Sequence, residues 1–125
     1  MAKILVVDDS VDFSYFISEL LKREGHSVTC ANDGEVAINT IKESGPFDVI
    51  LTDIIMPNMD GVSFMRHLQT TQNQAFVIAI SGGGVTMASK EALKVVESLV
   101  VAVFEKPIDY DALIAKIAEL VSDKE

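Results

Sequence analysis

Short apolar runs alternate along the chain with longer segments in which apolar residues recur every three or four positions. The short runs are rich in Val and Ile, which is typical of strands that are buried on both faces of a parallel sheet. The last strand of the set is closely followed by charged residues and a proline. The pattern predicts strands at residues Lys3–Val7, Ser27–Ala31, Val49–Thr52, Phe76–Ile80 and Val100–Phe104.

The longer segments predict five amphipathic helices, one after each strand. Asp9 or Ser10 can cap the first helix, and Gly25 stands where a left-handed residue would end it. The residues expected to face inward are Phe13, Phe16, Ile17, Leu20 and Leu21 in the first helix, Ala37, Ile38 and Ile41 in the second, Val62, Phe64, Met65 and Leu68 in the third, Ala92, Leu93 and Val96 in the fourth, and Leu113, Ile114, Ile117, Leu120 and Val121 in the fifth.

Strict alternation of strands and helices predicts an α/β fold, because parallel neighbours in a sheet need crossover helices. We expect a three-layer, flavodoxin-like sandwich with a five-stranded parallel sheet in the order 2-1-3-4-5 and five helices. A length of 125 residues without a repeat or linker predicts a single domain over residues 1–125. Right-handed crossovers place the carboxyl ends of all strands at one edge of this sheet.

Polar side chains that can carry chemistry follow the predicted strands at that edge. Asp8 and Asp9 end the first strand, Asp53 ends the third, Ser81 ends the fourth and Lys106 follows the fifth. In the expected strand order, the first and third strands flank the topological switch point, where open α/β sheets build their sites. We therefore expect three carboxylates, a hydroxyl and an ammonium group to converge.

Three neighbouring carboxylates repel one another, by roughly 4 kcal/mol per pair at about 4 Å and an effective dielectric near 20. A divalent cation relieves this repulsion, and oxygen ligands without His or Cys favour Mg²⁺. Lys106 and Ser81 add a positive charge and a hydrogen-bond donor suited to a phosphoryl group. Asp53, the acid that stands alone on its strand, is the candidate nucleophile for phosphoryl transfer.

Composition narrows the possible partners and the compartment. A net charge of −9 argues against direct binding to nucleic acid or an anionic membrane. No apolar run reaches the roughly 18 residues of a membrane span. The single cysteine, Cys30, excludes a disulfide within the chain and is expected to be a buried residue of the second strand. These features predict a cytoplasmic protein.

Four motifs give the chain a resemblance to a known family over essentially its whole length. They are VVDDS at Val6–Ser10, DxxMPxMDG at Asp53–Gly61, a serine at the end of an apolar strand, and the pair Lys106–Pro107. In this order and at these spacings the chain resembles the receiver domain of bacterial two-component response regulators. The polar tail and the first methionine suit a free-standing receiver.

The resemblance implies that Asp53 accepts a phosphoryl group from a phosphohistidine on a sensor histidine kinase or a histidine phosphotransfer protein. It implies direct Mg²⁺ ligation by Asp9, Asp53 and the backbone carbonyl of Ile55, with Asp8 acting through water. Lys106 would pair with the phosphoryl oxygens, and the Lys106–Pro107 bond would be cis. Ser81 would act as both catalytic and switch residue. The resemblance gives structural roles to Pro57, Gly61, Gly82 and Pro107.

The chain also departs from the family pattern. The family usually has an aromatic switch residue three positions before the lysine, but this chain has Val103 there and Phe104 one position later. Either Phe104 substitutes through a shifted strand, or switching takes another route. Ile55 and Gly83 border the site without a polar side chain to position water, so we expect a long-lived phosphorylated form.

Other functional classes remain open on the sequence alone. An aspartyl-nucleophile phosphohydrolase has a similar fold, but VVDDS lacks the residue between the two acids that the haloacid dehalogenase pattern requires. A flavodoxin-like cofactor site would have its phosphate repelled by Asp8 and Asp9. The chain could also be a receiver from a larger regulator or hybrid kinase, or a pseudo-receiver that is not phosphorylated. We expect no enzymatic activity beyond its own phosphorylation and dephosphorylation, and signalling through an unidentified protein target.

Overall fold

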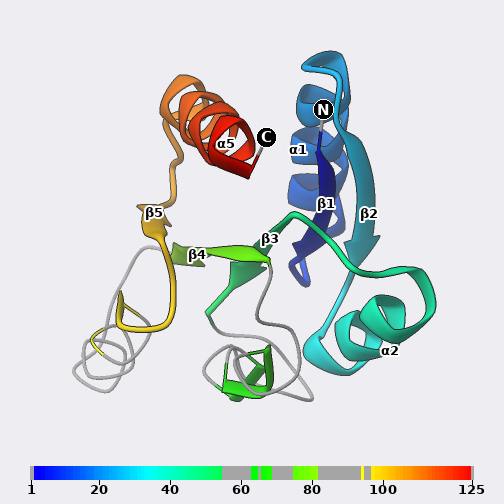
Figure 1. Cartoon of the computed structure of the whole chain (residues 1–125). Helices are drawn as coiled ribbons and strands as arrows, with labels where there is room; N and C mark the ends of the chain where they lie inside the picture. Colours follow the sequence, from blue (N-terminus) through cyan, green and yellow to red (C-terminus); the bar gives the residue numbers. More distant parts are fainter. Residues whose placement is uncertain are drawn as a thin grey trace.

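The computed structural model of the chain describes residues 2–54, 63–64, 66–68, 75–81, 94 and 97–124. Its centre is a five-stranded, parallel sheet in the order β2-β1-β3-β4-β5 (Figure 1), which confirms the predicted order. The strands are β1 (Lys3–Val7), β2 (Ser27–Ala31), β3 (Val49–Asp53), β4 (Phe76–Ser81) and β5 (Ala102–Glu105).

The predicted strand bounds agree with the structure except at the carboxyl ends of β3, β4 and β5 and at the start of β5. β3 and β4 each continue by one residue, to Asp53 and Ser81. β5 begins two residues later than predicted and includes Glu105. The residues expected at the strand ends are therefore held by the sheet itself or follow its last residue directly.

Three helices are described in full: α1 (Val11–Arg23), α2 (Gly34–Ser44) and α5 (Tyr110–Lys124). Ser10 caps α1, since its side chain accepts a hydrogen bond from the backbone N–H of Phe13 at 3.2 Å. Gly25 follows α1 with a φ of 93°, as predicted for a left-handed terminating residue. Residues 63–64, 66–68, 94 and 97 are helical and belong to the predicted third and fourth helices, whose other residues lie outside the described part.

The pleat of the strands divides the apolar residues into two cores, one on each face of the sheet. On β1, Ile4 and Val6 pack on one face and Leu5 and Val7 on the other. The first face carries α1 and α5, and the second carries α2 (Figure 1). Phe64 and Leu68 of the third predicted helix are buried in the second core, as expected. Successive residues of a strand therefore point to opposite faces of the sheet, and every second residue lies on the same face.

Two expectations about burial are wrong. Phe16 is half exposed and meets the ring of Tyr110 edge-on, with 4.9 Å between centroids, because the buried stripe of α1 runs through Ile17 and Leu21. Cys30 is exposed, and β2, to which it belongs, is an edge strand of the sheet. Its thiol donates to the carbonyl oxygen of Ser14 at 3.8 Å. A strand at the edge gives its outer positions fewer neighbours than a central strand does.

Among the described residues, no helix is long and apolar enough to cross a membrane. This finding agrees with the hydropathy of the sequence.

The chain start is tied to the loop before β2 by His26. The Nδ1 atom of His26 accepts a hydrogen bond from the backbone N–H of Ala2 at 3.1 Å. Partial burial lowers the pKa of His26, and the positive amino terminus lowers it further, while Glu24 acts in the opposite direction. The neutral imidazole is therefore the form that the folded state favours.

We expect the free energy of unfolding to fall as the pH drops below about 6.5, the ordinary pKa of histidine. The unfolded chain binds the proton at a higher pH than the folded chain does, so acid favours unfolding. His26→Asn keeps an acceptor but cannot be protonated, and should make the free energy of unfolding less dependent on pH between pH 7 and pH 5. Urea denaturation at several pH values would measure this. Parallel pH profiles for the two proteins would contradict the expectation.

Candidate functional site

Three carboxylates meet at the carboxyl edge of the sheet. Val7 of β1 pairs with Thr52 of β3, so the next residues, Asp8 and Asp53, stand side by side. With Asp9 they form a carboxylate cluster in which one oxygen of each residue lies within 4.8 Å of the others. Asp8 is buried, Asp53 is partly buried and Asp9 is exposed. The predicted convergence of the three acids is confirmed.

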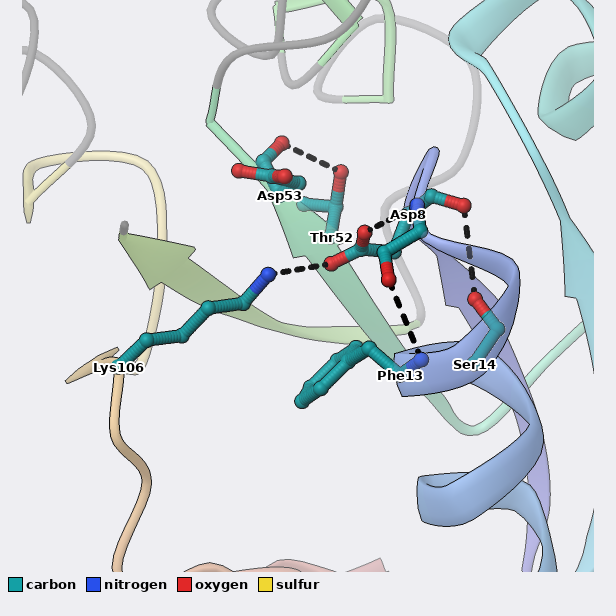
Figure 2. Close-up of polar contacts among 7 residues, drawn as sticks. Asp8, Phe13, Ser14, Thr52, Asp53 and Lys106 are labelled. Carbon is teal, nitrogen blue, oxygen red and sulfur yellow. Dashed lines mark hydrogen bonds and ion pairs between the residues drawn. The ribbon is translucent and has the colours of Figure 1, made fainter. Parts of the chain in front are cut away.

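The pleat explains which side chains share a face at this edge. Continuing the alternation of β1, β3 and β5 places Asp8, Asp53 and Lys106 on the face that carries α1 and α5. Figure 2 shows the Lys106 side chain extending to Asp8, with Asp53 on the neighbouring strand. Strands far apart in sequence therefore deliver two of the acids and the lysine to a single face.

Asp8 is the most enclosed member of the carboxylate cluster, with 2% of its surface exposed. Its Oδ1 accepts a hydrogen bond from the backbone N–H of Ser10 at 2.8 Å, and its Oδ2 accepts one from Lys106 Nζ at 3.3 Å. Its backbone N–H donates to the carbonyl of Ala31 at 3.1 Å, and its carbonyl accepts from the Ser14 hydroxyl at 3.4 Å. The Ser10 N–H and the Lys106 ammonium group offset part of the desolvation cost of this buried carboxylate.

Lys106 is held at the site by its backbone and by its side chain. Its N–H donates to the carbonyl of Ser81 at 2.8 Å, which joins β5 to β4 just beyond the paired residues. Its ammonium nitrogen lies 4.5 Å from the ring centroid of Phe13 as well as beside Asp8. The Lys106–Pro107 bond is cis, as the resemblance implied, and Gly45–Pro46 is also cis.

Ser81 lies at the edge but on a different side of the sheet. It is buried at the end of β4, and the alternation of β4 places its side chain on the face opposite Lys106. Val103 packs on the same face as Ser81, whereas Phe104 packs on the face of α1 and α5. Phe104 thus does not occupy the position that an aromatic residue at Val103 would fill, and the structure offers no support for a shifted strand.

Several residues singled out in the sequence lie outside the described part of the chain. They include Ile55, expected to offer a backbone carbonyl to a metal ion, and Gly83, expected to border the site. Pro107 is described and exposed. The structural roles expected for Pro57, Gly61 and Gly82 concern residues that also lie outside the described ranges.

The chemistry of the donor set fits a hard divalent cation. The cluster supplies three carboxylate groups within reach of one another, and its ligand atoms are all oxygens. Mg²⁺ is commonly held by one or two carboxylates and by waters, which suits a cluster in which Asp9 is exposed to solvent. Asp8, Asp9 and Asp53 are the described residues that would hold it.

Sequence reasoning missed the part played by Phe13. The helical period assigned it to the core, and it does pack against the core of α1 and α5. Its ring also lies under the Lys106 ammonium group (Figure 2). The only signal in the sequence is its place one helical turn after the acidic pair, which does not by itself indicate a contact with a lysine 93 positions later.

The family comparison covers nearly the whole chain. The model of the response regulator receiver domain family matches residues 4–118. The chain is 37% identical over 84 residues to the transcriptional regulatory protein CpxR of Escherichia coli, covering 67% of this chain and 35% of CpxR. It is 34% identical over 119 residues to the autoinducer sensor kinase/phosphatase CqsS of Vibrio cholerae, covering 95% of this chain and 17% of CqsS. The chain therefore spans about a third or less of these relatives.

Solved structures agree with the observed fold. The receiver domain of the Francisella response regulator 1452 superposes with a TM-score of 0.85 and 27% identity, with all of both chains covered. The response regulator TrrA of Thermotoga maritima, in a complex with Mg²⁺ and BeF, has a TM-score of 0.80 and 26% identity, covering 96% of this chain and 99% of TrrA.

The ion pair of Lys106 and Asp8 should compete with a divalent cation. Lys106→Met removes a positive charge 3.3 Å from a cluster oxygen, so we expect Mg²⁺ to bind about tenfold more tightly, which titration calorimetry would measure. Lys116→Met is the matched control, because Lys116 has the same 31% side-chain exposure but pairs with Glu119 of α5. Unchanged or weaker Mg²⁺ binding by the Lys106 variant would contradict the competition.

Proposed function

Because this chain belongs to the response regulator receiver domain family, we propose that it is a phosphoacceptor whose Asp53 takes a phosphoryl group from a phosphohistidine. The donor is a sensor histidine kinase or a histidine phosphotransfer protein, and the reaction depends on Mg²⁺. The similarity to CqsS, a sensor kinase/phosphatase, links the sequence to such signalling systems. Mg²⁺ is supported by the carboxylate cluster and by the Mg²⁺ complex of TrrA.

The main support for this proposal is that the three acids of the carboxylate cluster beside Lys106 differ in their exposure to solvent. Asp8 is buried and engaged with Lys106, whereas Asp53 is only partly buried at the end of β3. A nucleophile must be reachable by its donor, and its neighbours must neutralise the charge of the transferred group. Among the three acids, Asp53 alone combines a strand-end position with partial exposure.

Each site residue then has a chemical task. A carboxylate oxygen of Asp53 attacks phosphorus in line, the bond from phosphorus to the histidine nitrogen breaks, and that nitrogen keeps the electron pair. Mg²⁺ held by Asp8, Asp9 and Asp53 would supply positive charge for the phosphoryl oxygens. Lys106 supplies a second positive charge from the α1 and α5 face, and Ser81 offers a hydroxyl from the opposite face.

The signal then leaves through contact with a protein target. Val103 and Ser81 share a face of the sheet. A movement of Ser81 toward the phosphoryl group would therefore alter the packing of Val103 and of the residues around it. Since Phe104 lies on the other face, this coupling uses an aliphatic side chain. The net charge of −9 supports a protein target over nucleic acid.

Intact mass spectrometry after incubation with acetyl phosphate and Mg²⁺ tests the acceptor. We expect the wild-type chain to gain the mass of one phosphoryl group, and Asp53→Asn to gain none because an amide is not a nucleophile for this transfer. Asp12→Asn, in the exposed first turn of α1 and outside the cluster, is the matched control and should be modified like the wild type. Phosphorylation of Asp53→Asn at the wild-type rate would place the acceptor elsewhere.

The aliphatic residue Ile55 also leads to a prediction about the lifetime of the phosphorylated form. Asparagine at this position would offer an amide to orient an attacking water, so Ile55→Asn should lose its phosphoryl group several-fold faster. Decay of the phosphorylated species, followed by mass spectrometry after removal of the donor, measures the rate. Ile55→Val is the control with no new polar group, and equal lifetimes for all three proteins would refute the idea.

A further inference from the structure

The Phe13 ring and the Asp8 carboxylate together hold the ammonium group of Lys106. The ring centroid lies 4.5 Å from Nζ, and the carboxylate oxygen lies 3.3 Å from it. An ammonium group this close to a ring face is attracted by the ring quadrupole, more strongly when water is partly excluded. The lysine side chain is 31% exposed, so water is excluded from much of it.

The two partners of Lys106 differ in what else they do. Asp8 belongs to the carboxylate cluster, and a carboxylate that serves a divalent cation cannot give its full charge to a lysine at the same time. The Phe13 ring has no formal charge and no ligand atom for a hard cation. Its attraction for the ammonium group is therefore retained whatever Asp8 is bound to.

From this geometry we propose that Phe13 is a positioning residue for Lys106. It keeps the lysine at the phosphoryl site when the charge of Asp8 is taken up by a cation. The inference rests on the proposed phosphotransfer to Asp53 and adds a residue to it. Phe13 comes from α1 and Lys106 from the loop after β5, so the contact also joins two elements across the α1 and α5 face (Figure 2).

The Phe13 ring limits the conformational freedom of the Lys106 side chain. A lysine side chain loses much rotamer entropy when it is held in one position. If Asp8 were its only partner, Lys106 would regain that freedom whenever Asp8 bound a cation. Phe13 is itself packed against the core around Ile17, so its ring is a fixed platform. Leucine at position 13 would keep most of this packing but has no ring face.

Proton NMR of the wild-type protein tests the contact without any reaction. Protons that lie over a ring face are shifted upfield, so the ε-methylene protons of Lys106 should resonate upfield of those of Lys116. We expect the difference to persist with saturating Mg²⁺ and to vanish in Phe13→Leu. Loss of the upfield shift on adding Mg²⁺ to the wild type would overturn the proposal, because the ring would then not retain the lysine.

Phosphorylation rates with acetyl phosphate test the consequence. Phe13→Leu should be about 2- to 30-fold slower than the wild type at saturating Mg²⁺, and Phe13→Tyr, which keeps a ring, should stay close to it. In a Lys106→Met background, Phe13→Leu should cause no further loss, since the ring acts through the lysine. Tyr15→Leu, which removes an exposed aromatic residue from the same helix, should match the wild type.

An equal loss from Phe13→Leu in the wild-type and Lys106→Met backgrounds would show a structural effect of the substitution and would refute the proposal. A wild-type rate in Phe13→Leu would also refute it. These outcomes differ from a failure of the proposed function, in which the wild-type chain itself would gain no phosphoryl group. In that case the ring-current shift would still decide whether Phe13 retains Lys106.

Discussion

The site depends on a concentration of negative charge at the end of a close-packed parallel sheet. Asp8 is almost fully buried there and has Asp53 beside it on the next strand. Such an arrangement is costly unless positive charge and hydrogen-bond donors are supplied. Lys106 and the backbone N–H of Ser10 supply part of what is needed. The negative charge that Asp9 and Asp53 add suits a divalent cation, which the proposed phosphotransfer would use.

The pleat of the sheet turns this charge into a site with two sides. Asp8, Asp53 and Lys106 belong to the face that carries α1 and α5, whereas Ser81 belongs to the other. A phosphoryl group at Asp53 would thus be approached by the Lys106 ammonium group from one face and by the Ser81 hydroxyl from the other. In the proposed mechanism, phosphorylation involves Lys106 on one face, and Ser81 responds on the other. A phosphoryl group could in this way change the surface of the opposite face.

The position of Phe13 joins the site to the body of the domain. A lysine at the end of an edge strand would be free to leave the site, but its ammonium group lies over a ring that the core holds in place. The same helix begins two residues after the acidic pair, with Ser10 as its cap. Small displacements of α1 should therefore shift the positions of the acidic pair and of the Lys106 ammonium group together. A partner that contacts this helix could alter the site in this way.

The sequence by itself determined the strands, their order and the acids at their ends. Asp53 and Asp8 could be placed together because parallel strands in a right-handed fold present their carboxyl ends at one edge. Helical and strand periods alone do not show how a helix is rotated on the sheet or which strand lies at its edge. For that reason Phe16 and Cys30 were expected to be buried and are exposed. Only the tertiary structure decided that the Phe13 ring lies under a distant lysine, because a contact between remote segments depends on how the layers pack.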